Sequence, residues 1–137
     1  MSALAEFRGN EKILVADDEP VVLSYATTVL GRYGYEVVGA PNGHQALEIF
    51  ERLGEVDLVL TDIVMPDLSG PDLVHEVRRK YGNVRCLFMS GYQPAQLLER
   101  GIDASCGYLQ KPFTPEHLLR KIRATLDAEP PTSTLPN

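Results

Sequence analysis

Short apolar runs alternate along this chain with stretches in which apolar residues recur at helical spacing. The apolar runs are Lys12–Ala16, Glu36–Ala40, Asp57–Thr61, Val84–Met89 and Gly107–Gln110. After the first run, for example, Val22, Ala26 and Val29 share one face of a predicted helix. Strict alternation of strands and helices is typical of parallel βαβ units. The sequence therefore predicts an α/β fold, a doubly wound five-stranded parallel sheet with five helices.

Proline, threonine and glycine mark the predicted ends of the helices. Four prolines suit a first helical turn, where a missing N–H group costs nothing. They are Pro20, Pro71, Pro94 and Pro115. Thr114 is placed to cap the last helix, and Gly34 and Gly82 are placed to end the first and third. The second and fourth helices, Gly43–Leu53 and Pro94–Arg100, are expected from shorter apolar patterns.

The two ends of the chain lack any periodic pattern. Residues 128–137 hold three prolines among serine and threonine, and residues 1–10 show neither helical nor strand spacing. Segments of this kind bury too little apolar surface to offset the entropy of ordering them. We therefore expect a flexible N-terminus at 1–10, one domain at 11–127 and a flexible tail at 128–137.

Charge and composition argue against several classes of protein. The 137 residues carry 13 Lys and Arg against 19 Asp and Glu, a net charge of −6 that repels nucleic-acid phosphates. No run approaches the roughly 20 apolar residues of a membrane span, and no signal peptide is evident. Cys86 and Cys106 are too few for a disulfide framework, so we expect buried, reduced thiols. These features predict a cytoplasmic protein that binds neither nucleic acid nor membrane.

Acidic, hydroxyl and amino side chains follow four of the predicted strands. They are Asp17 and Asp18 after the first strand, Asp62 after the third, Ser90 after the fourth and Lys111 after the fifth. In a doubly wound sheet the carboxyl ends of the strands meet at one edge, where ligands bind. Three carboxylates brought together need a positive charge among them, and carboxylate oxygens suit Mg²⁺. With a lysine and a hydroxyl nearby, the set predicts Mg²⁺-assisted transfer of a phosphoryl group to a carboxylate.

Taken singly, each of these residues has an ordinary structural explanation. Asp17 and Asp18 are also suited to capping the helix that follows them, and Asp62 is suited to a turn. Ser90 precedes a glycine, as turn hydroxyls often do, and Lys111 precedes a proline in a segment typical of solvent-exposed lysines. Only the combination of all five favours a functional site.

Four segments, read in chain order, resemble one family. They are ILVADDEP, DLVLTDIVMPDLSG, CLFMSGY and GYLQKPF. Over residues 11–127 this set is similar to the receiver domain of two-component response regulators. The residues within the motifs resemble those of receivers attached to hybrid sensor histidine kinases. The resemblance implies the flavodoxin-like strand order 2-1-3-4-5.

The resemblance also implies a metal site and a phosphoacceptor. Asp62 would accept the phosphoryl group and share in binding Mg²⁺. Asp18 would bind the metal directly, and Asp17 would act largely through water. The backbone carbonyl of Val64 would complete the protein's share of the metal shell.

Further roles follow from the same resemblance. Ser90 and Lys111 would bind phosphoryl oxygens, and Tyr108 would be the aromatic switch residue. Pro112 matches the family's cis-proline after the lysine. A histidine kinase or a histidine phosphotransfer domain would donate the phosphoryl group, and a downstream protein partner would bind the changed surface. We expect a monomer or weak dimer that is not an enzyme by itself, either stand-alone or part of a hybrid kinase.

Two side chains near the expected phosphorylation site are unlike the polar residues common in relatives. Val64 and Tyr92 lie two positions beyond Asp62 and Ser90, where the family's geometry borders the path of the hydrolytic water. Neither side chain carries a carboxylate or amide that could orient this water. Because such positioning accelerates hydrolysis, we expect slow self-dephosphorylation.

Other functions remain possible at this stage. A Mg²⁺-dependent phosphatase of the haloacid-dehalogenase type needs a second Asp where this chain has Val64. A flavodoxin-like FMN carrier needs a phosphate loop rich in glycine and hydroxyls, but the segment after the first strand, DDEP, is acidic. A receiver that acts without phosphorylation is a third alternative, although all five chemical positions are filled. His44, His75 and His117 show no metal-ligand spacing, and we expect them at the surface.

Overall fold

Five strands and five α-helices alternate in this computed structural model, which describes residues 4–101 and 107–129. In chain order they are β1 (Lys12–Ala16), α1 (Pro20–Arg32), β2 (Glu36–Ala40), α2 (Gly43–Leu53), β3 (Leu58–Asp62), α3 (Gly70–Tyr81), β4 (Arg85–Ser90), α4 (Pro94–Glu99), β5 (Tyr108–Gln110) and α5 (Pro115–Asp127). A short 3₁₀ helix, η1 (Ala5–Phe7), precedes β1.

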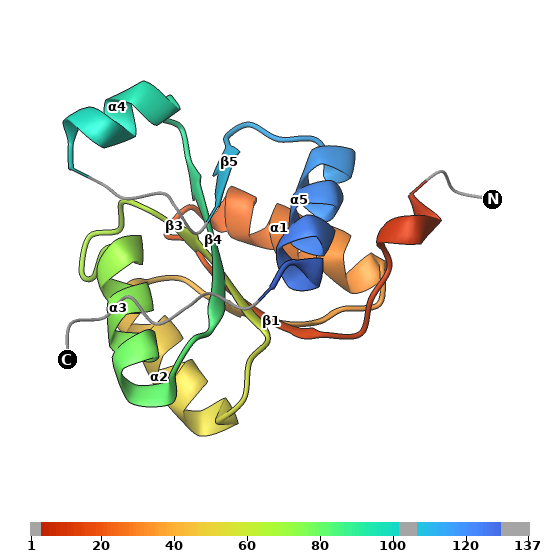
Figure 1. Ribbon diagram of the computed structural model, residues 1–137, viewed down its shortest axis with the longest axis horizontal. Helices are drawn as coiled ribbons and strands as arrows, with labels where there is room; N and C mark the ends of the chain where they lie inside the picture. The colour runs from red at the N-terminus through yellow and green to blue at the C-terminus, as the bar shows by residue number, and fades with distance from the viewer. Residues whose placement is uncertain (1–3, 102–106, 130–137) are drawn as a thin grey trace.

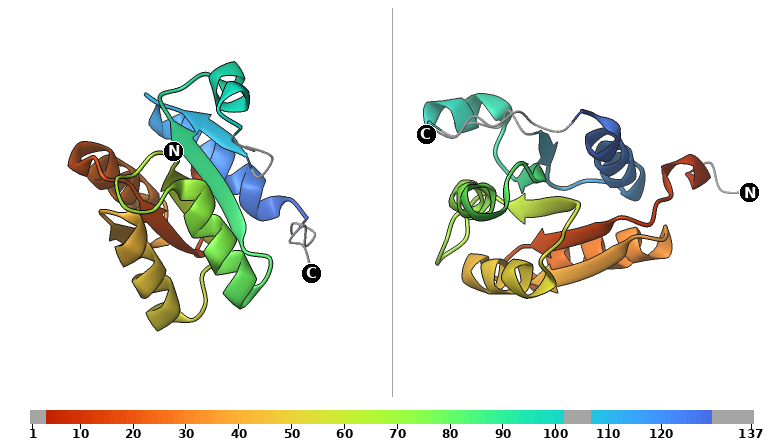
Figure 2. Two further views of the ribbon diagram at one scale, coloured as in Figure 1. Left: turned by 90° about the vertical axis from the view of Figure 1, so that its left-hand side faces the viewer. Right: turned by 60° about the horizontal axis from the view of Figure 1, so that its bottom comes forward.

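The strands form one parallel sheet in the order β2-β1-β3-β4-β5, which confirms the predicted topology. Helices α1 and α5 cover one face of the sheet, and α2 and α3 cover the other (Figure 1). The same layering is visible from two further directions (Figure 2). Because all strands of the sheet are parallel, the carboxyl ends of β1, β3, β4 and β5 lie along one edge.

The sheet is the centre of the hydrophobic core. All five residues of β3 are buried, as expected for a central strand covered on both faces. One apolar cluster joins β1 and β3 to α1 and α5, and a second joins the opposite faces of these strands to α2 and α3. Packing on both faces fixes the ends of the strands, and with them the side chains at the edge.

Three strands differ by one residue from the prediction. β3 and β4 each begin and end one residue later, and β5 begins one residue later. Asp57 lies before β3, where its carboxylate accepts a hydrogen bond from the backbone of β1. At the other end Asp62 pairs in register with Met89, and Ser90 pairs with Gln110. Asp62 and Ser90 are thus the last residues of their strands, and sheet hydrogen bonds hold their backbones.

The helix ends follow the predicted punctuation. Each of the four prolines lies in the first turn of its helix. The Thr114 side chain accepts a hydrogen bond from the backbone of His117, as a capping residue does. Gly34 and Gly82 follow α1 and α3 with φ of +98° and +91°, a conformation that favours glycine. α4 ends at Glu99, one residue earlier than predicted.

The described part of the N-terminal segment is attached to the domain. η1 packs against α5, and the Tyr35 hydroxyl donates a hydrogen bond to the carbonyl of Phe7 over 2.6 Å. Arg123 of α5 donates hydrogen bonds to Glu11, to Asp127 and to Tyr35. We call this group, Glu11, Tyr35, Arg123 and Asp127, the N-terminal clasp. The flexibility expected of residues 1–10 and 128–137 stays a prediction, and residues 1–3 and 130–137 lie outside the described ones.

The structure bears on two expectations drawn from composition, the burial of the cysteines and the lack of a membrane span. Cys86 is 2% exposed, in agreement with the expected burial, whereas Cys106 lies outside the described residues. Among the helices that the structure describes, none is long and apolar enough to cross a bilayer.

Candidate functional site

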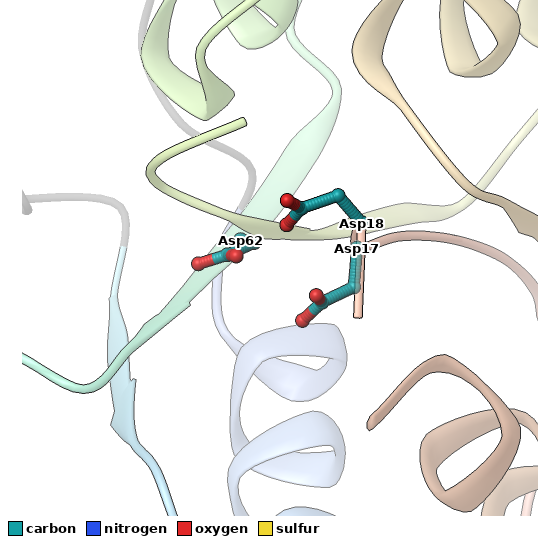
Figure 3. A group of neighbouring side chains, drawn as sticks. All are labelled: Asp17, Asp18 and Asp62. Carbon is teal, nitrogen blue, oxygen red and sulfur yellow. The ribbon is translucent and has the colours of Figure 1, made fainter. Parts of the chain in front are cut away.

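Three carboxylates lie together at the carboxyl edge of the sheet (Figure 3). β1 and β3 are parallel neighbours, and Ala16 pairs with Thr61, so the residues that follow are brought side by side. Asp17, Asp18 and Asp62 each place one carboxylate oxygen within 4.8 Å of the others. Asp17 is fully buried, Asp62 is 7% exposed, and Asp18 is exposed. The strand order therefore produces the acidic cluster that the sequence predicts.

Lys111 brings a positive charge to this cluster. Its Nζ lies 2.8 Å from Asp17 Oδ2 and 3.3 Å from Asp62 Oδ2. The same ammonium lies 3.1 Å from the Oε1 atom of Glu19, a contact that the sequence analysis missed. The signal for it was present, since Glu19 directly follows the aspartate pair. The ammonium of Lys111 thus contacts the carboxylates of Asp17, Glu19 and Asp62. The carboxylate of Asp18 lies beside them.

Burial and the neighbouring charges shift the pKa values of Asp62 and Lys111. Burial raises the pKa of Asp62 to about 6, and the charge of Asp17 adds to the rise while Lys111 opposes it. Burial alone would lower the pKa of Lys111, but the hydrogen bond with Asp17 and the charge of Asp62 outweigh it and raise that pKa. The environment of Asp62 therefore disfavours its ionised form, and a nearby cation stabilises the ionised form.

The donor set fits a hard divalent cation. Asp17, Asp18 and Asp62 offer oxygen atoms only, which is the chemistry preferred by Mg²⁺ and Ca²⁺. The cluster carries more negative charge than Lys111 neutralises, so a bound cation relieves a repulsion that is already present. We conclude that this acidic cluster could bind a metal ion.

The start of α3 approaches the backbone of Asp62 so closely that position 70 requires a glycine. The N–H of Gly70 donates a hydrogen bond to the Ile63 carbonyl over 2.8 Å. A Cβ atom on Gly70 would lie 2.3 Å from the backbone oxygen of Asp62, far inside contact distance. Gly70 therefore lets α3 begin directly against the end of β3, a positioning role that the sequence analysis did not identify.

Ser90 and Tyr108 are linked through the loop after β4. Ser90 is 2% exposed, and its Oγ accepts a hydrogen bond from the backbone N–H of Tyr92 over 3.0 Å. The hydroxyl of Tyr108 donates to the Tyr92 carbonyl and lies 3.3 Å from the Ser90 carbonyl. Burial raises the pKa of the Tyr108 hydroxyl, so it stays protonated and able to donate. The three residues form one hydrogen-bonded unit beside the acidic cluster.

The remaining predicted residues lie around this unit. The peptide bond between Lys111 and Pro112 is cis, as the resemblance implies. Val64 is 52% exposed on the loop after Asp62. The ring of Tyr92 packs against the apolar cluster between α3 and α4, and the Arg100 guanidinium lies 4.2 Å from its centroid. Whether Val64 and Tyr92 affect hydrolysis stays a prediction.

The three histidines are exposed, in agreement with the prediction. His44 nevertheless has a partner that was not foreseen, because its Nδ1 lies 2.8 Å from Oδ2 of Asp67. Asp67 belongs to the loop after β3 and His44 to the first turn of α2, so this pair joins two segments that flank the site.

A groove of about 510 Å³ borders Lys111 between α1 and the loop before α5. Its lining is Glu19, Val21, Val22, Tyr25, Gly91, Lys111, Pro112 and Phe113. Val21 is 81% exposed, while the Tyr25 and Phe113 rings pack together with centroids 5.7 Å apart. The acidic cluster therefore opens next to a surface that has both apolar and charged residues.

Comparisons with known proteins agree with this geometry. The family model for the response regulator receiver domain matches residues 13–123. The chain is 36% identical to "Sensor kinase CckA" of Brucella abortus (strain 2308) over 126 residues, which cover 90% of this chain and 13% of that kinase. It is 34% identical to "Probable transcriptional regulator ycf27" of Porphyridium aerugineum, with coverage of 93% and 54%. The chain thus spans about half or less of these curated relatives.

Solved structures of similar fold cover this chain more evenly. The receiver domain of the hybrid histidine kinase CckA is 33% identical with a TM-score of 0.71, covering 85% of this chain and 99% of that one. The chemotaxis response regulator CheY4 of Vibrio cholerae is 29% identical with a TM-score of 0.74 and the same coverage.

Proposed function

Because this chain belongs to the response regulator receiver family, we propose that it is a phosphoacceptor switch of a two-component phosphorelay. Asp62 is the acceptor, and the donor is a phosphohistidine on a histidine kinase or a histidine phosphotransfer domain. The observation that carries the proposal is the position of Asp62, with its carboxylate at the end of β3, 3.3 Å from Lys111 and among two other carboxylates.

The transfer itself requires a nucleophilic carboxylate oxygen and groups that stabilise the charge of the phosphoryl group. An Asp62 carboxylate oxygen attacks the phosphorus in line, an O–P bond forms, and the P–N bond to the donor imidazole breaks. The electron pair of that bond returns to the imidazole nitrogen. The acyl phosphate carries about −1.5 to −2 charge at neutral pH, where the free carboxylate carried −1. Lys111 already lies within reach of the Asp62 oxygens and pairs with the added oxygens.

Asp17, Asp18 and Asp62, with the backbone carbonyl of Val64, are the groups that would hold Mg²⁺. When bound, the metal supplies positive charge that offsets the carboxylates and the incoming phosphoryl oxygens. The support for this assignment is the donor set and its excess of negative charge. Asp18 is the exposed member and would be a direct ligand, whereas buried Asp17 is held by Lys111 and by the Glu19 N–H.

The switch uses the hydrogen-bonded unit of Ser90, Tyr92 and Tyr108. Ser90 Oγ accepts a hydrogen bond from the Tyr92 N–H, and the Ser90 O–H can donate to a charged phosphoryl oxygen on Asp62. If Ser90 turns toward Asp62, the loop that Tyr108 holds through the Tyr92 carbonyl loses one of its ties. The surface around α4 and β5 then shifts between two populated states, and a downstream protein partner binds one of them.

We further propose that the donor docks beside the groove at Lys111. The exposed Val21 and the half-buried Phe113 offer apolar contact within reach of the acidic cluster. On this proposal the chain is a signalling module of the cytoplasm, monomeric or weakly dimeric, that promotes only its own phosphorylation and dephosphorylation.

The experiment is phosphorylation by a small donor such as acetyl phosphate, with and without Mg²⁺, followed by mass spectrometry of the intact chain and its peptides. We expect one added phosphate on Asp62 that depends on divalent metal. The Asp62→Asn variant, nearly isosteric, should keep its circular dichroism and take no phosphate. Phosphate that persists in this variant, or that maps to another residue, contradicts the assignment.

A further inference from the structure

The side chain of Asp67, on the loop after β3, binds the first turn of α2. Its Oδ1 accepts a hydrogen bond from the Gly43 N–H over 3.1 Å, and its Oδ2 accepts one from the His44 N–H over 2.9 Å. The same Oδ2 lies 2.8 Å from Nδ1 of His44. One carboxylate therefore binds two otherwise unpaired N–H groups at a helix start, together with a side chain there.

The contact between loop and helix is also close at Leu68, the residue after Asp67. A Cβ atom on Gly43 would lie 2.5 Å from the Leu68 carbonyl oxygen and 2.6 Å from the Leu68 Cβ. Burial alone would raise the pKa of Asp67, but the hydrogen bonds from the His44 and Gly43 backbones outweigh it and lower that pKa to about 2. The carboxylate is therefore ionised, and its hydrogen bonds are intact, across the whole physiological range.

The beginning of this loop is fixed as well. The Ile63 N–H donates to the Met89 carbonyl over 3.1 Å, and the Ile63 carbonyl accepts from Gly70 over 2.8 Å. Met65 is 7% exposed and packs in the apolar cluster under α2 and α3. Val64, whose side chain is 52% exposed, lies between Ile63 and Met65, so the residues on both sides of it are held in place.

We propose that Asp67 is a positioning residue for phosphorylation: its attachment to α2 fixes the loop backbone that carries the Val64 carbonyl next to Asp62. Asp67 is not one of the three carboxylates of the acidic cluster. It acts through the loop, in the way that residues supporting metal ligands commonly set affinity. This inference rests on the proposed function and deepens it, since it names the contact by which α2 contributes to the site.

Asn42 provides a matched control for a role in capping alone. Its side chain accepts a hydrogen bond from the Gln45 N–H over 2.9 Å and so stabilises the same turn of α2 through a bond within the helix start. Asn42→Ala and Asp67→Ala should each lower the melting temperature by about 4 °C, the usual cost of one cap in a domain of this size. If Asp67 only caps α2, the two variants should behave alike in every other respect.

The experiment measures Mg²⁺ affinity by calorimetry and the rate of phosphorylation by acetyl phosphate in wild type and both variants. We expect Asp67→Ala to weaken Mg²⁺ binding by about tenfold and to slow phosphorylation at subsaturating Mg²⁺, whereas Asn42→Ala changes neither. Asp67→Asn keeps one acceptor oxygen and should give an intermediate affinity. Equal Mg²⁺ affinity and equal rates in Asp67→Ala and Asn42→Ala overturn the proposal.

A second measurement separates this inference from the proposed function. Amide hydrogen exchange at Val64 and Met65, in metal-free protein, reports how firmly the loop is held whether or not the chain accepts phosphate. Exchange should accelerate in Asp67→Ala and stay at the wild-type rate in Asn42→Ala. Unchanged exchange in Asp67→Ala overturns the positioning role, while a wild type that binds Mg²⁺ but takes no phosphate contradicts the proposed function alone.

Discussion

Strand β1 has a cluster of charged side chains at each of its ends. The two clusters shift the pKa values of their carboxylates in opposite directions. Before its start, in the N-terminal clasp, Arg123 donates hydrogen bonds to Glu11 and to Asp127. The hydrogen bond from Arg123 holds the pKa of Glu11 below its usual value. After the end of β1, burial and the charge of Asp17 raise the pKa of Asp62 to about 6.

The difference comes from burial and from the geometry of the cation. The guanidinium of Arg123 has several N–H donors and satisfies two partly exposed carboxylates at once. The single ammonium of Lys111 lies among carboxylates of which Asp17 and Asp62 are almost completely buried. The clasp therefore stabilises the fold. At the carboxyl edge of the sheet, by contrast, the acidic cluster holds carboxylates that repel one another, and a bound cation would reduce this repulsion.

The two clusters should respond to pH with opposite signs. The pKa of Glu11 is lower in the folded state, so its contribution is complete above its unfolded pKa of about 4.5 and is lost as the pH falls through the lowered value. The pKa of Asp62 is higher in the folded state, so the folded state binds the extra proton between about 4 and 6. Ionisation of Asp62 therefore reduces stability as the pH rises through this window.

The largest effect on stability is expected from a larger side chain at position 70, next to the carboxyl edge of the sheet. Gly70→Ala places a Cβ atom against the Asp62 backbone oxygen and should lower the free energy of unfolding by about 2–3 kcal/mol, as overpacking does. Phosphorylation by a small donor should slow at the same time because Asp62 is displaced. Denaturant unfolding is the measurement. Gly91→Ala is the control, since a Cβ there meets nothing within 4 Å. A stable, fully active Gly70→Ala protein contradicts the close approach.

The next largest effect should come from breaking the clasp. Arg123→Ala leaves Glu11 and the Tyr35 hydroxyl without their shared donor and should cost about 2 kcal/mol, less than a fully buried pair would. Its control is Arg79→Ala, which removes an exposed ion pair with Glu76 and should have no measurable effect. Similar losses in the two variants would show that the clasp is no more than a surface pair.

A smaller effect should show the sign of the clasp's pH dependence. Glu11→Gln should destabilise the protein by about 1 kcal/mol at neutral pH, because the charge-assisted bond to Arg123 becomes a neutral one. The difference from wild type should vanish as the pH falls well below 4, where Glu11 is protonated in both states. Urea titrations at a series of pH values measure this. A difference that grows in acid contradicts the lowered pKa.

The smallest effect concerns the lifetime of the phosphorylated state at the edge. Val64→Asn combined with Tyr92→Ala introduces an amide near the expected path of the hydrolytic water. We expect the lifetime at constant Mg²⁺ to shorten about threefold, equivalent to less than 1 kcal/mol in the barrier. Release of phosphate from the phosphorylated chain gives the rate. Because the Tyr92 ring packs toward Arg100, Tyr92→Ala alone should change the rate less than Val64→Asn. An unchanged or longer lifetime in the double variant removes both side chains from this role.

The predictable parts of the molecule are those determined by short-range pattern. Continuous apolar runs locate buried strands, and parallel topology brings their ends to one edge, so Asp17, Asp18 and Asp62 could be placed together before any coordinates. The strand limits were harder. Asp62 and Ser90 look like loop residues by polarity, yet pairing with Met89 and Gln110 extends the strands over them.

Contacts that depend on distant side chains were not predictable. Glu11 and Arg123 are 112 positions apart, and Asp67 lies 23 positions from His44, so no local spacing connects them. The role of Gly70 depends on how closely α3 approaches β3, which a single sequence does not reveal. Only the Glu19 contact had a local signal, because it directly follows the aspartate pair.

The central claim, that the edge stores an unfavourable charge which a cation relieves, is tested most directly by the stability of Asp62→Asn with and without Mg²⁺. At neutral pH without metal, the variant should be more stable than wild type by about 1 kcal/mol, a value reduced from the full pKa shift because solvent reaches part of the site. Added Mg²⁺ should stabilise wild type and narrow this gap. A variant that is no more stable than wild type without metal, or a gap that Mg²⁺ leaves unchanged, contradicts the account.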